Sequence, residues 1–201
     1  ESQLRTLNPG TLAQKSGKTD PQHAKIAYIL PGADPVFEQT ISTRRVVFLP
    51  VGGEDQTPNL KTSRIEAEAV VRLITMFKHI WAANGKTWQP ARTLGVITPW
   101  RAQIAQIREC LPAAGLDPDE VTIDTVERYQ GGARDVIIIS TCVQAEYQMT
   151  GLVNLSSEGV DRKLNVALTR AREHLIMIGN EAILRQDERY RAFIEQYRIQ
   201  P

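Results

Sequence analysis

The sequence predicts an α/β fold of three layers, in which a mainly parallel sheet is covered by helices on both faces. Short apolar runs alternate along the chain with longer segments whose apolar residues recur at helical spacing, the order that parallel sheets require. Residues 136–142 are almost wholly apolar, as expected of a strand buried on both faces. A chain of 201 residues, 42% of them hydrophobic, is long enough to bury such a core.

The first elements follow from local signals. Residues 1–43 contain repeated turn residues, and we expect a weakly structured segment or the remnant of a connection between domains. The folded domain is expected over residues 44–201 and begins with a strand over residues 46–51. A long helix should follow Ser63, because Ser63 and Glu66 fit a capping box. The Asn84-Gly85 pair should end it.

The alternation continues to the end of the chain. Strands are expected over residues 94–97, 121–126, 136–142 and 175–178. Helices are expected from Pro99 to Leu111, over residues 164–172, and once or twice after the last strand, with a polar loop over residues 144–160. Ligands of parallel sheets collect at the carboxyl ends of strands. That rule directs attention to Thr98-Pro99, to residues 130–132 and to the helix expected to carry Arg170.

Composition restricts the class of protein. The net charge of +1 neither requires nor excludes nucleic acid. Cys110 and Cys142 do not form a disulfide framework, which favours a reduced cytoplasmic or other intracellular setting. No apolar run has the length of a membrane span and no signal peptide is evident, so no membrane partner is expected. His23, His79 and His174 do not cluster with cysteines, and no metal site is expected.

Three segments combine polar chemistry with a strand–helix junction. They are Gly-Val-Ile-Thr-Pro-Trp-Arg-Ala-Gln at residues 95–103, the block at residues 122–141, and Leu-Asn-Val-Ala-Leu-Thr-Arg-Ala-Arg at residues 164–172. Their order and spacing resemble motifs IV, V and VI of superfamily 1 helicases of the Upf1/Dna2-like group. The resemblance covers residues 44 to about 185. It implies the C-terminal (second) RecA-like motor domain, a fold of the P-loop NTPase type.

Arg170 is the expected catalytic residue. Phosphoryl transfer is catalysed mainly by positioning and charge stabilisation, and a guanidinium stays charged and can fork onto phosphate oxygens. The resemblance implies that Arg170 acts as an arginine finger across a cleft shared with the first RecA-like domain. Taken alone, the residues leave another interpretation open, in which Arg170 and Arg172 lie on a solvated helix face or pair with Glu173 or Asp161.

A glycine-containing turn is the expected nucleotide contact. Glycine lets the backbone approach a ligand closely, and amides at such turns can bind phosphate. The residues expected to bind ATP are Gln130, Gly131, Gly132 and Arg172. The family pattern is Gln-Gly-x-Glu-x-Asp, in which the glutamate binds the nucleotide sugar. Ala133 stands in that place here, so a hydrogen bond of about 1–3 kcal/mol would be lost. Asp135 is retained and should brace the turn.

A second set of residues is expected to contact single-stranded nucleic acid. It comprises Thr98, Pro99, Trp100, Thr125 and Glu127. A hydroxyl and amides at a helix start suit phosphate contacts. Trp100 could stack on a base, which is worth about 1–3 kcal/mol, or it could plug the core or a domain interface. DNA is favoured over RNA as the track, although the resemblance leaves that choice open; it implies movement in the 5′→3′ direction.

The sequence lacks the groups that would make it an ATPase alone. It has no complete phosphate-binding loop, since Leu12 stands where the pattern ending in Gly17-Lys18-Thr19 needs glycine. It also has no Asp-Glu pair after a buried strand. The resemblance implies that ATP with Mg²⁺ is bound mainly by the first RecA-like domain and that this chain alone is inactive. The rival hypothesis is a degenerate helicase-like module that binds nucleic acid or protein, with Ala133 as a sign of lost activity.

Overall fold

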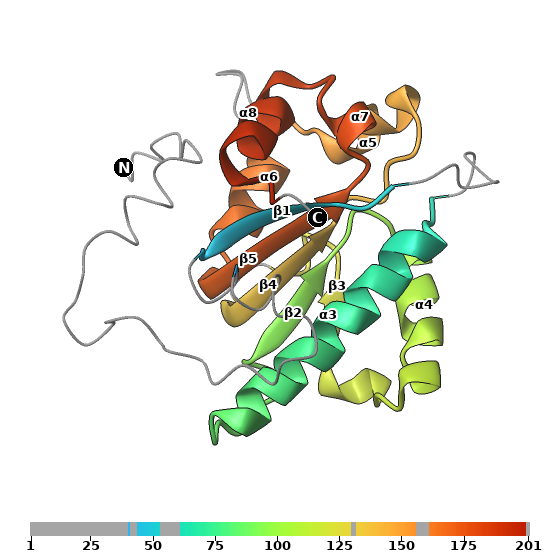
Figure 1. Cartoon of the computed structure of the whole chain (residues 1–201). Helices are drawn as coiled ribbons and strands as arrows, with labels where there is room; N and C mark the ends of the chain where they lie inside the picture. The colour runs from blue at the N-terminus through green and yellow to red at the C-terminus, as the bar shows by residue number, and fades with distance from the viewer. Residues whose placement is uncertain (1–39, 41–43, 53–60, 130–131, 156–160, 200–201) are drawn as a thin grey trace.

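A computed structural model describes residues 40, 44–52, 61–129, 132–155 and 161–199 (Figure 1). The described part contains a five-stranded sheet in the order β1-β5-β4-β2-β3. Every neighbouring pair of strands is parallel. The strands are β1 Val46–Pro50, β2 Leu94–Ile97, β3 Thr122–Asp124, β4 Arg134–Ser140 and β5 Ala171–Gly179.

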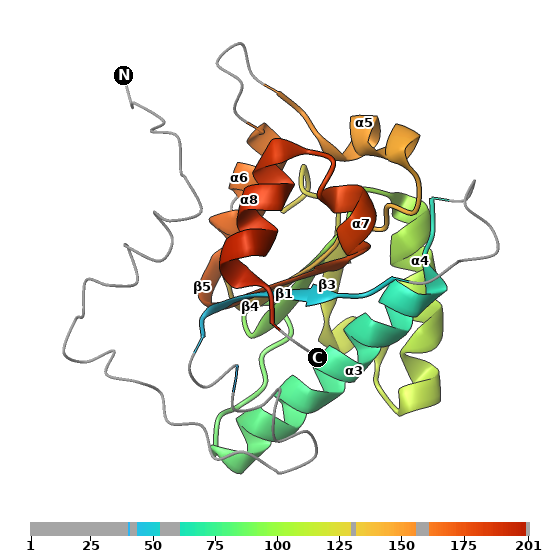
Figure 2. The same cartoon turned by 45° about the horizontal axis from the view of Figure 1, so that its top comes forward.

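Helices cover both faces of this sheet, as Figure 2 shows. One face carries α3 Arg64–Ala83 and α4 Arg101–Cys110, with the short turns η2 Pro112–Ala114 and η3 Pro118–Glu120. The other face carries η4 Glu146–Gln148, α5 Met149–Leu152, α6 Arg162–Leu168, α7 Glu181–Leu184 and α8 Glu188–Tyr197. The prediction of a three-layer RecA-like α/β fold is confirmed.

The central strands are buried on both sides. In β4, Val136 and Ile138 belong to the core beneath α3, whereas Ile137 and Ile139 belong to the core beneath α6 and α8. Side chains of a strand alternate between faces, so a strand between two helical layers needs apolar residues at every position. This is why residues 136–139 of β4 form one continuous apolar run.

Parallel strands give the sheet two chemically different edges. We call the edge at which the strands end the carboxyl edge, and the edge at which they begin the amino edge. Residues directly after the strands are Val51, Thr98, Thr125, Thr141 and Asn180, and residues directly before them are Arg45, Thr93, Val121, Ala133 and Arg170. Thr98 and Thr125 thus lie at the carboxyl edge, whereas Arg170 lies at the amino edge.

The outer side of β1 is partly covered by the C-terminal segment. The backbone N–H of Ile199 donates to the carbonyl oxygen of Phe48 at 3.0 Å. The Ile199 side chain is 7% exposed and packs into the core on the α3 side. The Arg44 guanidinium donates to the carbonyl oxygen of Arg198 at 3.4 Å.

Several element predictions are wrong in extent. The strand expected over residues 175–178 spans residues 171–179, and the strand expected over residues 136–142 spans residues 134–140. The helix expected over residues 164–172 ends at Leu168, because the following residues pair with β4: the N–H of Arg134 donates to the carbonyl oxygen of Arg170. The strand expected over residues 121–126 ends at Asp124, where residues 125–129 form a turn. The loop expected over residues 144–160 contains η4 and α5, and its residues 156–160 lie outside the described residues.

The capping box at the start of α3 forms only in part. The Ser63 hydroxyl accepts a hydrogen bond from the N–H of Glu66 at 3.3 Å, as expected. The Glu66 carboxylate is fully buried and accepts from the Ser140 hydroxyl at 2.7 Å and from the N–H of Cys142 at 2.9 Å. Gln103 joins the same network, since its amide donates to Ser63 at 3.0 Å and to Ser140 at 3.3 Å. The carboxylate therefore fastens α3 to the end of β4.

Candidate functional site

The predicted site residues divide between the two edges of the sheet. Gly132, Arg170 and Arg172 lie at or next to the amino edge, whereas Thr98, Pro99, Trp100, Thr125 and Glu127 lie at the carboxyl edge. The expectation that all of them gather at the carboxyl ends of strands is wrong for the first group. The chain returns after Thr125 to the start of β4, and α6 leads back to the start of β5. Gln130 and Gly131 lie outside the described residues.

Arg170 occupies the turn between α6 and β5. It is half-buried, its N–H donates to the carbonyl oxygen of Ala167 at 3.2 Å, and its own carbonyl accepts from Arg134 at 2.9 Å. The Nε atom of its guanidinium is buried and has no hydrogen-bond partner among the described residues. A guanidinium is always charged, so a buried, unused donor at this position fits an anionic ligand such as a phosphate group.

Arg172 lies in β5 and contacts its neighbour strand. Its guanidinium lies 3.5 Å from the Asp135 carboxylate, and the N–H of Asp135 donates to the carbonyl oxygen of Arg92 at 3.0 Å. The Asp135 side chain thus pairs with β5, and its predicted bracing of the segment before β4 stays a prediction. Because this pair is already formed, Arg172 would have to exchange a carboxylate for phosphate before it could bind nucleotide.

Two further residues at the amino edge were missed by sequence reasoning. The Arg134 guanidinium lies over the Tyr129 ring, 5.4 Å from its centroid. The Tyr129 hydroxyl donates to the carbonyl oxygen of Thr122 at 2.8 Å. Burial raises the pKa of Tyr129 well above its ordinary value, so the hydroxyl keeps its proton at neutral pH. The sequence signal for these two residues was their position on either side of the Gln-Gly-Gly-Ala segment, residues 130–133.

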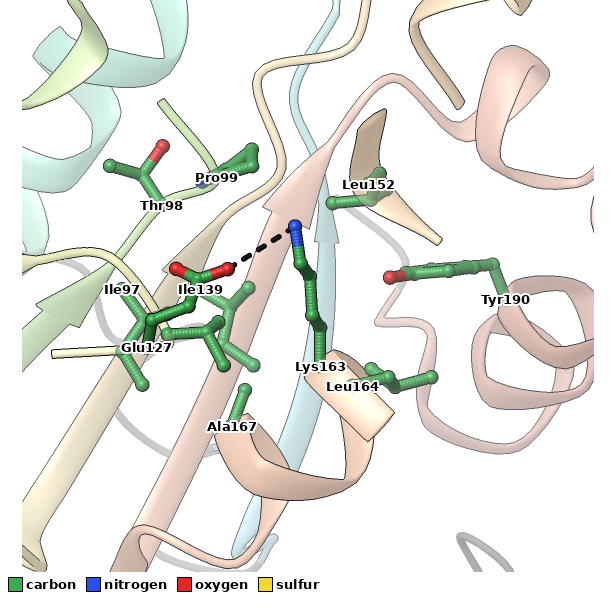
Figure 3. A pocket seen from close by; sticks show the side chains of 11 residues that line it. Ile97, Thr98, Pro99, Glu127, Ile139, Leu152, Lys163, Leu164, Ala167 and Tyr190 are labelled. Atoms are coloured by element: carbon green, nitrogen blue, oxygen red, sulfur yellow. Dashed lines mark ion pairs between the residues drawn. The ribbon is translucent and has the colours of Figure 1, made fainter. Parts of the chain in front are cut away.

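A small cavity lies at the carboxyl edge beneath α6 and α8 (Figure 3). Thr98 lines it and is fully buried. Its N–H donates to the carbonyl oxygen of Asp124 at 3.2 Å, and its hydroxyl has no partner among the described residues. The cavity measures about 20 Å³. That volume suffices for about one water molecule and excludes a nucleobase.

Glu127 at the mouth of this cavity forms an ion pair. Its carboxylate lies 3.3 Å from the ammonium group of Lys163, which also donates to the carbonyl oxygen of Gly151 at 3.4 Å. Partial burial would raise the pKa of Glu127, but hydrogen bonds from its own N–H, from Thr125 and from Lys163 outweigh that effect and lower the pKa. Glu127 is therefore a carboxylate at neutral pH.

Trp100 is half-buried and packs against the core on the α6–α8 side. A Cβ at position 151 would lie 3.3 Å from its Cζ2 atom, so the indole lies against the backbone of Gly151. Part of the ring therefore plugs the core, which was one of the two interpretations. Thr125 is half-buried, and its N–H donates to the Asp124 carboxylate at 2.8 Å.

Neither metal ligation nor a membrane span is seen in the described ranges. Within them, no three His, Cys, Asp or Glu side chains are grouped so that they could hold a metal ion. The helices in those same ranges are too short or too polar to cross a lipid bilayer.

Comparison with known protein families identifies the family of this chain. A family model described as an AAA domain matches residues 9–182. The chain belongs to this family. It is the C-terminal helicase domain of Upf1-like superfamily 1 helicases, and the resemblance seen in the three motif blocks is confirmed.

Relatives of this helicase domain are much longer proteins. MOV-10 of Gallus gallus is 30% identical over 164 residues, which cover 76% of this chain and 17% of that protein. Regulator of nonsense transcripts 1 of Dictyostelium discoideum is 29% identical over 201 residues, or 96% and 13% of the two chains. An uncharacterized ATP-dependent helicase of Methanocaldococcus jannaschii, MJ0104, is 29% identical over 162 residues, or 81% and 22%. The chain spans less than a quarter of the length of each.

The helicase domain thus presents two separate surfaces. The amino edge brings together the blocks that resemble motifs V and VI, through the hydrogen bond from the N–H of Arg134 to the carbonyl oxygen of Arg170. The carboxyl edge brings together the blocks that resemble motifs IV and V, with Lys163 of α6 between them. The sequence analysis did not identify Lys163 as a site residue. Its position two residues after Asp161, the N-cap of α6, was the sequence feature that could have placed it at this edge.

Proposed function

We propose that this domain is the second motor domain of an ATP-dependent nucleic acid helicase and supplies Arg170 as an arginine finger to an ATP site between two RecA-like domains. The observation that carries the proposal is the half-buried Arg170 guanidinium at the amino edge, whose Nε lacks a partner among the described residues. ATP, when bound, supplies the phosphoryl group that is transferred to water. Arg170 then stabilises the negative charge that develops on the phosphate oxygens.

The other amino-edge residues have supporting roles in this proposal. Gln130, Gly131 and Gly132 approach the nucleotide through their backbone, and Arg172 approaches it from β5. The β4–β5 pairing holds Arg170 beside this turn, since Arg134 and Arg170 share a backbone hydrogen bond of 2.9 Å. Mg²⁺ and the phosphate-binding loop belong to the first RecA-like domain.

Substitution of Arg170 in the full-length protein tests the assignment. Arg170→Ala should lower strand-stimulated ATP hydrolysis about 10³-fold or more, because an arginine finger contributes rate mainly in the transition state. Arg170→Lys should also be strongly impaired, since an ammonium group cannot fork onto two oxygens. Affinity for a fluorescent ATP analogue should change much less than the rate. Arg108→Ala, at an exposed position on α4, is the control. Hydrolysis that survives Arg170→Ala would refute the arginine finger.

The isolated chain should not hydrolyse ATP. The purified 201-residue chain lacks the phosphate-binding loop and the Asp-Glu pair, so we expect no turnover above background with single strands present. Turnover that disappears in Arg170→Ala would contradict this expectation.

The track in this proposal is a single strand at the carboxyl edge, contacted by Thr98, Pro99, Trp100, Thr125 and Glu127. DNA is retained as the favoured strand and 5′→3′ as the direction. Unwinding of matched DNA and RNA duplexes with either a 5′ or a 3′ overhang decides both points. An intracellular location is part of the proposal, because Cys110 and the buried Cys142 are both free and free cysteines are typical of a reducing compartment.

A binding module without ATPase activity is the second candidate. Ala133 favours it, because a methyl group cannot accept a hydrogen bond from a nucleotide sugar. Ala133 is half-buried, and its carbonyl oxygen accepts a hydrogen bond from the Arg134 guanidinium at 3.4 Å. Full-length protein that binds single strands and hydrolyses no ATP would favour this module over the motor.

A further inference from the structure

We propose that Lys163 binds a phosphate group of the single strand at the carboxyl edge and that Glu127 holds its ammonium group in place until a strand arrives. The proposal rests on the proposed function and deepens it, because it names the residue and the chemical group through which the strand is bound. The strand contacts expected from the sequence include Glu127, a carboxylate, and no lysine.

Lys163 is placed for such a contact. Figure 3 shows its side chain extending from α6 across the cavity, with the ammonium group beside Glu127. An ammonium group has three N–H donors. The described partners are the Glu127 carboxylate at 3.3 Å and the Gly151 carbonyl at 3.4 Å. The Lys163 side chain is 27% exposed, so solvent and ligand can reach it.

The charges of Glu127 and Lys163 favour Lys163 as the residue that binds the phosphate. Glu127 is ionised, and a carboxylate repels phosphate oxygens, so the phosphate contact at this edge is expected from Lys163 and not from Glu127. Its side chain is 56% exposed. Ion pairs with that degree of exposure contribute little stability. A strand phosphate can therefore replace the carboxylate beside Lys163 at small cost.

The surroundings favour a nucleic acid strand over an isolated anion. The indole of Trp100 lies against Gly151, the residue whose carbonyl accepts from Lys163. An aromatic ring beside a cation can take a base and its phosphate together, as single-strand binding surfaces do. The fully buried Thr98 hydroxyl, without a partner among the described residues, adds a polar group to the same lining. Because the cavity excludes a base, the base must lie on its rim.

Two substitutions with opposite expected signs test the proposal. The full-length protein is titrated, without nucleotide, against fluorescent oligothymidylate and oligouridylate from about 50 to about 200 mM salt. Lys163→Ala should weaken binding and lower the slope of log affinity against log salt by about 0.7, the value for one single-strand phosphate contact. Glu127→Gln should tighten binding, because the competing carboxylate is gone. Lys163→Arg should keep the slope.

A matched ion pair on the opposite face is the control. Lys78 of α3 pairs with Glu120, and their side chains are 26% and 41% exposed, against 27% and 56% for Lys163 and Glu127. Lys78→Ala and Glu120→Gln should leave affinity and slope unchanged. A merely structural Glu127–Lys163 pair would shift affinity in the same direction in both substitutions, or leave the slope unchanged, and either result overturns the proposal while the motor function stands. Wild-type protein that binds neither oligonucleotide overturns both.

Discussion

The Tyr129 hydroxyl lies directly over the backbone of Gly95. A Cβ at position 95 would come within 2.0 Å of the hydroxyl oxygen and within 2.8 Å of the ring carbon Cζ. Only glycine leaves room for the ring here. The Tyr129 hydroxyl donates a hydrogen bond to the carbonyl oxygen of Thr122 at 2.8 Å. The contact joins the block resembling motif IV to the block resembling motif V.

Gly95→Ala should therefore destabilise the domain by about 2 kcal/mol, because the ring of Tyr129 must move and give up its hydrogen bond. Urea denaturation of the 201-residue chain measures this. The same substitution in a Tyr129→Phe background should cost less, since the closest clashing atom is absent. Equal costs in the two backgrounds would show that the contact does not limit position 95.

Glu66→Ala should destabilise the domain by about 3 kcal/mol, because it leaves the Ser140 hydroxyl and the buried N–H of Cys142 without their acceptor. Glu68→Ala is the matched control on the same helix. Glu68 is exposed and pairs with Arg64 at 3.0 Å, so its loss should cost no more than about 0.5 kcal/mol. Similar unfolding midpoints for the two variants would contradict the buried network.

His174 should make stability depend on pH. Burial, followed by the positive charges of Arg45 and Lys86, lowers its pKa to about 4 from an ordinary value of 6.5. Between these values the unfolded chain binds more protons than the folded chain, so stability falls as the pH falls. The loss from pH 7.5 to pH 5 should be about 2 kcal/mol.

Replacement of His174 by Phe isolates this contribution. His174 packs near Phe77, with ring centroids 6.1 Å apart, so an aromatic ring suits the position. His174→Phe should lose less stability than the wild type between pH 7.5 and pH 5, by the amount that the histidine contributes. Parallel pH profiles for the two proteins would show that His174 does not titrate in the unfolding reaction.

Much of the fold could be predicted because its signals are local. The apolar runs of β2, β4 and β5 and the Ser63 cap of α3 are set by neighbours in sequence. The end of α6 could not be predicted in that way. Residues 169–172 continue a helical pattern, but the pairing of Ala171 with Arg134, with its hydrogen bond from the Arg134 N–H to the Arg170 carbonyl, is a long-range contact and terminates the helix.

The residues of the candidate site could be proposed from the sequence, but their positions relative to one another could not. The motif blocks identified Arg170 and Thr98, since each residue belongs to a recognisable pattern. Their separation to opposite edges follows from the direction in which α6 and the 125–133 segment cross the sheet, which no local pattern contains. The Glu127–Lys163 pair joins residues far apart in sequence, so the lysine could be found only after the fold was known.

The backbone hydrogen bond between Ile199 and Phe48 affects the solubility expected of shortened forms of the domain. Unpaired strand edges recruit other chains into extended sheets. The outer backbone of β1 is shielded by this hydrogen bond and by the buried Ile199 side chain. A truncation that removes residues 198–201 should leave β1 open to intermolecular pairing and uncover apolar surface above α3. Loss of solubility, with a β-rich aggregate, is the expected behaviour of such a shortened chain.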